Sequence, residues 1–104
     1  MDNCIFCKII NSEIPCTKIY EDENYLAFLD VEPKSEGHTL LIPKKHYRWI
    51  YDVENFSEYF EKAKELANIL KNKYQADFVE LHAVGTDVDH AHIHLIPQKL
   101  WKKN

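Results

Sequence analysis

The sequence lacks a long apolar run. No stretch approaches the ~20 consecutive apolar residues that a membrane-spanning helix needs, so we expect a soluble protein. It also lacks an excess of positive charge. The net charge of −4 with neutral histidines argues against broad electrostatic attraction to nucleic acid or to an anionic membrane. No repeat, linker or low-complexity segment is present.

Cysteine is scarce and unevenly placed. The three cysteines, Cys4, Cys7 and Cys16, all lie within the first sixteen residues. That segment does not have the basic-then-apolar layout of a secretory signal. An odd, crowded set of cysteines without such a signal indicates the cytoplasm, where thiols stay reduced.

The length and composition predict one packed domain. The chain has 104 residues, of which 45% are hydrophobic. A chain of this length buries about two thirds of its unfolded surface. We therefore expect a single domain over residues 1–104.

The most informative stretch is 89–97, in which His90, His92 and His94 alternate with apolar residues. A period of two is typical of a β-strand, whose successive side chains point to opposite faces. One face would then be apolar and the other lined by imidazoles about 6.6 Å apart. Such a row can span a phosphate or bind a metal. Proline cannot donate to a ladder, so we expect the strand to end near Pro97.

The N-terminal segment 4–10 pairs Cys4 with Cys7 in a short, apolar, helical pattern. The C-x-x-C spacing suits two thiolates on one metal, and structural zinc needs four ligands. A redox pair has the same spacing, but a thioredoxin-like site needs a preceding strand. Two small buried hydrophobic side chains are the third reading.

Between these landmarks the sequence predicts a hairpin, a strand, a helix and a further strand. The hairpin strands are 17–21 and 25–30, and the next strand is 37–43. Strands 25–30 and 37–43 are almost entirely apolar, so both faces should be covered. Asp30, at the end of its strand, either binds a pair of sugar hydroxyls or caps a turn.

The only long helical pattern covers residues 55–74, with Asn55 as N-cap and Glu58 closing a capping box. A helical turn is expected over 47–50 and a half-exposed strand over 77–84. The order of elements predicts an α+β fold with a mainly antiparallel five-stranded sheet. His38 and His82 fall within predicted strands, and we interpret both as structural. His46, in an exposed connection, is a candidate nitrogen ligand for the cysteine pair.

The chain resembles the histidine triad (HIT) family, whose motif alternates histidine and an apolar residue three times. The resemblance covers nearly the whole chain. Besides the triad, it includes segment 4–10, the strand end 27–30 and the stretch 37–46. The cysteine pair resembles the zinc-bearing, phosphoramidase-like (Hint) branch more than the diadenosine polyphosphate hydrolases.

The resemblance implies a homodimeric, purine nucleotide-binding enzyme that hydrolyses or transfers nucleoside monophosphate groups through a covalent histidine intermediate. His92 matches the nucleophile and His94 the phosphate-contacting histidine. Asp30 matches the carboxylate that holds the ribose hydroxyls. The family's structural zinc site corresponds to Cys4, Cys7, His46 and His90, and its apolar base pocket to Ile5, Phe6, Ile9, Phe28, Leu29 and Val31.

The chain departs from the family just before the triad. Family members usually have Gly-Gln-x-Val there, where the glutamine and its neighbour bind phosphate oxygens. Here Thr86, Asp87 and Val88 follow Gly85. These three residues therefore occupy the phosphate-binding positions, and the carboxylate of Asp87 is expected to weaken affinity for an anion.

The chemistry also follows from the residues. A neutral imidazole is a competent nucleophile toward phosphorus, and flanking imidazoles stabilise the developing charge. Three alternatives remain: a nucleotide-binding scaffold with little turnover, a dinucleoside polyphosphate hydrolase, and a metalloenzyme with catalytic zinc on the histidine row. Four-ligand coordination by the cysteine pair and two histidines would close the zinc site, which counts against the last.

Overall fold

The computed structural model describes residues 3–100, so the ends of the predicted domain lie outside the described residues. Within this range, one antiparallel sheet has the strand order β1-β2-β3-β5-β4. The strands are β1 (Lys18–Glu21), β2 (Tyr25–Leu29), β3 (Thr39–Pro43), β4 (Phe78–His82) and β5 (Ile93–Gln98). The predicted α+β class and five-stranded antiparallel sheet are confirmed.

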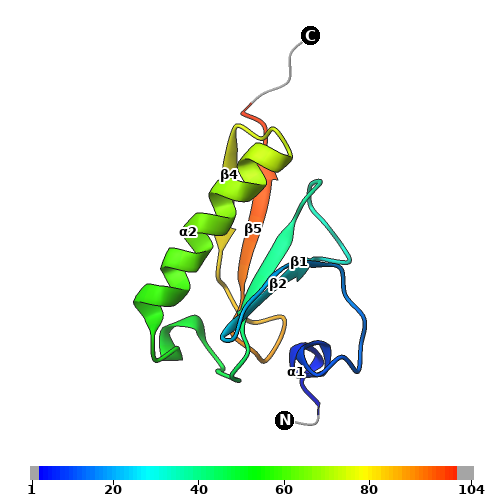
Figure 1. The fold of residues 1–104 in the computed structure, drawn as a ribbon, viewed down its shortest axis with the longest axis vertical. Coiled ribbons are helices and arrows are strands. Elements are labelled where there is room, and N and C mark those ends of the chain that lie inside the picture. The colour runs from blue at the N-terminus through cyan, green and yellow to red at the C-terminus, as the bar shows by residue number, and fades with distance from the viewer. Residues whose placement is uncertain (1–2, 101–104) are drawn as a thin grey trace.

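Two α-helices and one 3-10 turn complete the described elements. The short helix α1 spans Ile5–Ile10 and the long helix α2 spans Phe56–Lys73. The turn η1 covers Ile50–Asp52, slightly later than the predicted turn over 47–50. In Figure 1, α2 runs along one side of the sheet and α1 lies on the other side, near the N-terminus.

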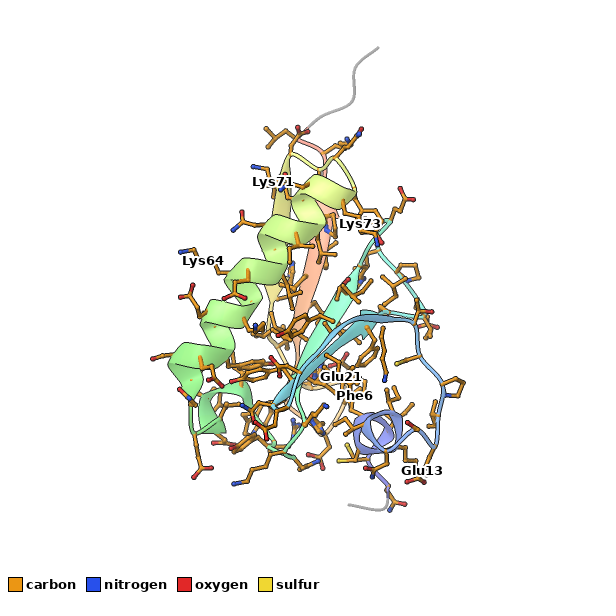
Figure 2. All side chains as sticks on the ribbon, viewed as in Figure 1. Phe6, Glu13, Glu21, Lys64, Lys71 and Lys73 are labelled. Carbon is orange, nitrogen blue, oxygen red and sulfur yellow. The ribbon has the colours of Figure 1, made fainter. Side chains whose placement is uncertain are left out.

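The sheet is covered on both faces because its central strands alternate between two apolar clusters. On β2, Tyr25 and Ala27 pack in the cluster that includes α2, whereas Leu26 and Phe28 pack with α1. Figure 2 shows Phe6 close to the sheet and Lys64 on the outer side of α2. No helix in the described part of the chain is long and apolar enough to cross a membrane.

The predicted capping box at the start of α2 is wrong. Asn55 holds the N-cap position, but its side chain makes no capping hydrogen bond. The carboxylate of Glu58 instead accepts a hydrogen bond of 2.8 Å from the Tyr25 hydroxyl. Glu58 therefore ties α2 to β2 rather than closing the end of the helix.

The histidine strand is also shorter than predicted, since β5 begins only at Ile93. The backbone N–H of Ala91 donates to the carbonyl oxygen of Tyr47 at 2.7 Å, not to a strand of the sheet. His90 and His92 consequently lie before β5, and His94 alone of the three belongs to the strand. The alternation itself persists, because Ala91, Ile93 and Leu95 are all buried in the cluster that contains α2.

Pro97 lies within β5, one residue before its end at Gln98. Its carbonyl oxygen accepts a hydrogen bond from the Ser35 hydroxyl, on the side where β3 no longer pairs with β5. The missing N–H of proline faces the same side in an antiparallel strand, so β4 loses no ladder partner there.

Candidate functional site

A cleft of about 1010 Å³ opens between α1, the end of β2 and the loop that precedes β5. Both candidate catalytic residues, His92 and His94, line it. Every residue that the resemblance assigned to substrate binding lines it too: Ile5, Phe6, Ile9, Phe28, Leu29, Asp30, Val31, Thr86, Asp87 and Val88. Val31 is 92% exposed, so it lies at the rim rather than in the apolar wall. The structure thus gathers residues from four separate segments around one cavity.

His92 is buried at the floor of this cleft, and its ring packs nearly perpendicular to the Phe6 ring at a centroid distance of 5.3 Å. Its Nδ1 lies 2.7 Å from the carbonyl oxygen of His90. A carbonyl oxygen only accepts, so Nδ1 carries the proton and the lone pair of the neutral ring is on Nε2. The backbone therefore fixes the tautomer in which Nε2, facing the cleft, is the nucleophilic atom.

Asp87 contacts this nucleophilic atom. One carboxylate oxygen, Oδ1, is 3.0 Å from Nε2 of His92, and the other, Oδ2, is 3.8 Å from Nε2 of His94. The first contact is a hydrogen bond only while Nε2 of His92 carries a proton. Asp87 must therefore move before a phosphorus atom can reach that nitrogen.

His94 is oriented by a second histidine through a chain of hydrogen bonds. The backbone N–H of Lys34 donates to Nδ1 of His38 at 3.0 Å, so the proton of the His38 ring is on Nε2. That Nε2–H donates to Nδ1 of His94 at 2.9 Å. His94 is left with its own proton on Nε2, which makes it a hydrogen-bond donor toward the cleft.

The electrostatics keep these two rings neutral. Burial lowers the pKa of His38 and of His94 below the usual 6.5, and for His94 the neighbouring His92 and His38 lower it further. Desolvation disfavours the charged form, so both rings stay uncharged at pH 7. The proton positions deduced from the hydrogen bonds are those of neutral imidazoles.

From the sequence, His38 is interpreted as structural and is not assigned to the site. In the structure it lines the cleft and is buried, and it lies just before β3, which begins at Thr39 rather than at the predicted Gly37. Gly37, in the turn before the strand, has a φ of +88°. A Cβ at Gly37 would lie 2.5 Å from the Tyr74 ring, so glycine is required at this turn. His38 meets His94 only because β3 pairs with β5, and a spacing of 56 residues carries no signal of that contact. His82, also interpreted as structural, lines the cleft at its exposed rim.

Of the two alternatives predicted for Asp30, the structure confirms the capping of a turn. Its Oδ1 accepts the backbone N–H of Glu32 at 2.9 Å, which caps the turn after β2. Its Oδ2 points toward the histidine pair, 3.5 Å from Nε2 of His38. This second oxygen is available to accept a hydrogen bond from a hydroxyl in the cleft.

The four predicted metal ligands, Cys4, Cys7, His46 and His90, meet at the N-terminus of α1. Their ligand atoms all lie within 4.8 Å of one another. Nδ1 of His90 is 3.3 Å from Sγ of Cys4 and 3.6 Å from Sγ of Cys7, which in turn is 3.3 Å from Nδ1 of His46. Tetrahedral zinc with normal bond lengths would separate sulfur from nitrogen by roughly 3.5 Å.

The surroundings of the cluster also suit a metal ion. Nε2 of His90 lies 2.8 Å from the carbonyl oxygen of Pro43, which leaves Nδ1 as the free lone pair. Burial lowers the pKa of His90 to about 4, so its ring is neutral. Burial and the adjacent Cys4 thiol raise the pKa of Cys7 to about 11, and a dication between the sulfurs would reverse that effect. The donor set therefore fits zinc.

The predicted row of three histidines is thus divided between two sites. His90 turns toward the cysteines, whereas the rings of His92 and His94 lie 5.1 Å apart in the cleft. His90 lies before β5 and packs beside α1, where its ring contacts Phe6 at a centroid distance of 5.9 Å.

Comparisons with known proteins identify the family and the fold. The HIT domain family model matches residues 11–100. The chain is 43% identical over 99 residues to the adenosine 5'-monophosphoramidase of Saccharomyces cerevisiae, which covers 92% of this chain and 63% of the yeast protein. The crystal structure of a Hit-like protein from Bartonella henselae superposes with a TM-score of 0.90 at 34% identity, covering 96% of this chain and 83% of that one.

A zinc-bound histidine triad family protein from Mycobacterium smegmatis has the same fold, with a TM-score of 0.86 at 31% identity over 98% of this chain and 79% of that one. The family model spans most of the described residues, and it includes the triad and the cleft segments from β1 onward. On this evidence the chain belongs to the HIT domain family.

Proposed function

We propose that this chain, a HIT-family nucleotide hydrolase, cleaves purine nucleoside phosphoramidates or related nucleoside monophosphate esters through a covalent nucleotidyl-histidine intermediate on His92. The observation that carries the proposal is the fixed tautomer of His92. Its Nδ1 donates to a backbone carbonyl oxygen, and its Nε2 faces a cleft large enough for a nucleotide. A relative named as an adenosine 5'-monophosphoramidase supports the choice of substrate.

The nucleoside would occupy the end of the cleft between α1 and β2. Phe6, Ile9 and Phe28 form an apolar wall there, and the rings of Phe6 and Phe28 meet edge to face at 5.6 Å. A purine base gains free energy by leaving water against such a wall. Oδ2 of Asp30 would accept hydrogen bonds from the ribose hydroxyls.

The reaction follows from the proton positions. Nε2 of His92 attacks phosphorus, a nitrogen–phosphorus bond to the enzyme forms, and the bond to the leaving amine breaks. The departing amine takes a proton from water, and the hydroxide that remains neutralises the proton released when a second water attacks phosphorus. Nε2–H of His94 donates a hydrogen bond to the phosphate oxygens, which carry more charge in the transition state. Water then attacks phosphorus, and the nucleoside monophosphate leaves with a regenerated neutral His92.

Zinc, when bound by Cys4, Cys7, His46 and His90, would hold α1 against the segment before β5 and supply no ligand position to substrate. Phe6 lies between these cysteines in the sequence and packs on both His90 and His92. The metal would thereby stabilise the wall of the cleft.

One observation favours the alternative of a nucleotide-binding scaffold with little turnover. The carboxylate of Asp87 lies against Nε2 of His92, where a substrate phosphorus has to approach. Asp87 is on an exposed loop, with a side chain that is 60% exposed, and a bound phosphate can displace it. We therefore prefer the enzyme.

The test is turnover of an adenosine phosphoramidate by intact and by chelated protein. The proposed enzyme releases adenosine monophosphate, and removal of zinc lowers its thermal stability before it affects the chemistry. Nucleotide binding without turnover would support the scaffold. Loss of turnover at a temperature where the chelated protein is still folded would support catalytic zinc.

We also propose that the chain forms a homodimer in the cytoplasm. The dimer rests on the family resemblance. The location rests on the cysteines, which are all free thiols.

A further inference from the structure

The cleft carries an unbalanced negative charge beside the nucleophile. Among residues 3–100, its carboxylate and ammonium lining consists of Asp30, Glu32 and Asp87 against Lys34. Asp30 is engaged in the turn after β2 and with the histidine pair. Asp87 differs, because among the described residues it has no lysine or arginine partner and contacts only His92 and His94.

The neighbouring acid shows the contrast. Asp89, two residues later, has its charge offset by Arg48, whose Nε lies 3.2 Å from Oδ1. The same arginine donates through Nη1 to the carbonyl oxygen of Gly85 at 2.8 Å. Arg48 thus anchors both ends of the loop, and Asp87 is left between the anchors with its charge facing the cleft.

The leaving group of a bound substrate would lie near the negative charge of Asp87. The apolar wall of α1 and β2 and the ribose-facing oxygen of Asp30 place the nucleoside at the other end of the cleft. Before substrate binds, the Asp87 carboxylate lies 3.0 Å from Nε2 of His92 and 3.8 Å from Nε2 of His94. With phosphorus at Nε2 of His92, the displaced carboxylate stays on its exposed loop at the open rim, toward which the remaining substituent of the phosphorus also lies.

We propose that Asp87 is a specificity-determining residue. It selects substrates whose leaving group bears a cationic substituent, such as an ammonium group at the end of a chain, and it disfavours anionic leaving groups such as polyphosphate chains. This proposal rests on the proposed function. The phosphorus–nitrogen bond breaks as described above, and Asp87 takes no proton. It acts only through its charge, which attracts an ammonium group and repels a phosphate or carboxylate near the rim.

The expected effect of the Asp87 charge on kcat/KM follows from Coulomb's law. The carboxylate is largely solvent-exposed, so water weakens its field, and a charge a few ångströms away changes kcat/KM by roughly threefold to thirtyfold. The preference should shrink in concentrated salt, because the screening length falls from about 30 Å at 0.01 M to about 3 Å at 1 M.

The experiment compares three adenosine phosphoramidates whose leaving amines carry an aminobutyl, a hydroxybutyl or a carboxypropyl chain of similar length. Wild type, Asp87→Asn and the matched control Asp89→Asn are assayed for kcat/KM at low salt. Comparing ratios between proteins removes the intrinsic reactivity of the three amines, because that reactivity is the same in each protein.

Wild type should cleave the cationic substrate faster than the neutral one and the anionic one slowest. Asp87→Asn should reduce the cationic-to-anionic ratio by roughly threefold to thirtyfold, and Asp89→Asn should preserve the order. An unchanged ratio in Asp87→Asn would overturn the assignment. If that variant does not fold, a wild-type ratio that is insensitive to salt overturns it equally.

The outcomes separate this inference from the function on which it rests. Cleavage of all three substrates at rates independent of the charge on the leaving group would support the phosphoramidase activity and refute only the role of Asp87. Cleavage of none would remove both.

Discussion

At the scale of single residues, the chemistry of the cleft depends on which ring nitrogens of His92 and His94 carry a proton. A backbone carbonyl oxygen holds the proton of His92 on Nδ1, and the Lys34 N–H sets the proton of His38, which in turn sets that of His94. The result is one imidazole whose Nε2 lone pair becomes accessible once Asp87 moves, and one with an N–H available to donate, both facing the same cavity. A nucleophile and a donor for phosphate oxygens are the two groups that transfer of a nucleotidyl group to histidine requires.

The buried His38 predicts a loss of stability in acid. Burial lowers its pKa below the 6.5 of an unfolded chain. Below pH 6.5 the His38 ring binds a proton in the unfolded chain but stays neutral in the folded protein. The free energy of unfolding therefore falls as the pH decreases from that value. Above it, the contribution of His38 is fully present.

The variant His38→Gln should show a shallower decline in melting temperature between pH 7 and pH 5 than wild type. Both proteins are measured with zinc bound, so that the metal ligands contribute equally to the two curves. Parallel curves would show that His38 does not titrate in this way.

At the scale of elements, the sequence predicted most of the helices and strands but not where the histidine strand begins. Alternation indicates which face a side chain takes, and Ala91, Ile93 and Leu95 are indeed buried together. It does not indicate whether the backbone pairs with a strand. Ala91 donates to Tyr47, in a connection far away in sequence, and no local pattern encodes that contact. The failed capping box has the same origin, since Glu58 is engaged by Tyr25 of β2.

The candidate site was predictable where a family pattern exists. The cleft contains all ten substrate-binding residues assigned by resemblance, and the four metal ligands lie together. Resemblance did not assign His38, because its contact depends on the pairing of β3 with β5. Nor did it give the contact of Asp87 with His92, which lies where the chain departs from the family's Gly-Gln-x-Val.

The short helix α1 gives an element-scale prediction about zinc. Helices of six residues are marginal alone, so α1 depends on its contacts with the sheet and on the cluster at its N-terminus. Cys7→Ser should lower the zinc content and the melting temperature. Cys16→Ser, which alters a cysteine outside the cluster, should leave the zinc content unchanged.

Elemental analysis and thermal denaturation of the two variants provide the measurement. Wild-type protein purified without chelators should contain one zinc per chain. An absence of zinc from such protein, or an equal loss in both variants, would remove the metal site.

At the scale of the whole molecule, one sheet separates two apolar clusters with different tasks. The cluster with α2 contains Tyr59 and Leu66, both fully buried, and gives the larger core. The cluster with α1 provides the apolar wall of the cleft through Phe6 and Phe28. The functional site therefore lies on the face that the smaller helix covers incompletely.

The proposed homodimer is a prediction at this scale. Light scattering should give twice the 12.4 kDa mass of one chain. A mass near 12.4 kDa across the concentrations used for activity would refute the dimer and leave the chemistry of the cleft untouched.

If His92 is the nucleophile, His92→Asn should lose turnover but keep nucleotide binding. Loss of the nucleophile should lower kcat by several orders of magnitude, whereas nucleotide affinity should largely remain, because Asp30 and the apolar wall are unchanged. Calorimetric binding and single-turnover rates on the same preparation separate the two effects. Near-normal turnover in the variant would point to direct attack by water.

The most direct measurement is mass spectrometry of protein quenched during turnover of an adenosine phosphoramidate, under conditions that preserve phosphorus–nitrogen bonds to histidine. If His92 is the nucleophile, wild type should carry one added adenosine monophosphate on the peptide that contains His92, formed and lost at rates compatible with kcat, and His92→Asn should carry none. Product accumulating while His92 stays unmodified at every time point would show that the reaction does not pass through a nucleotidyl-histidine.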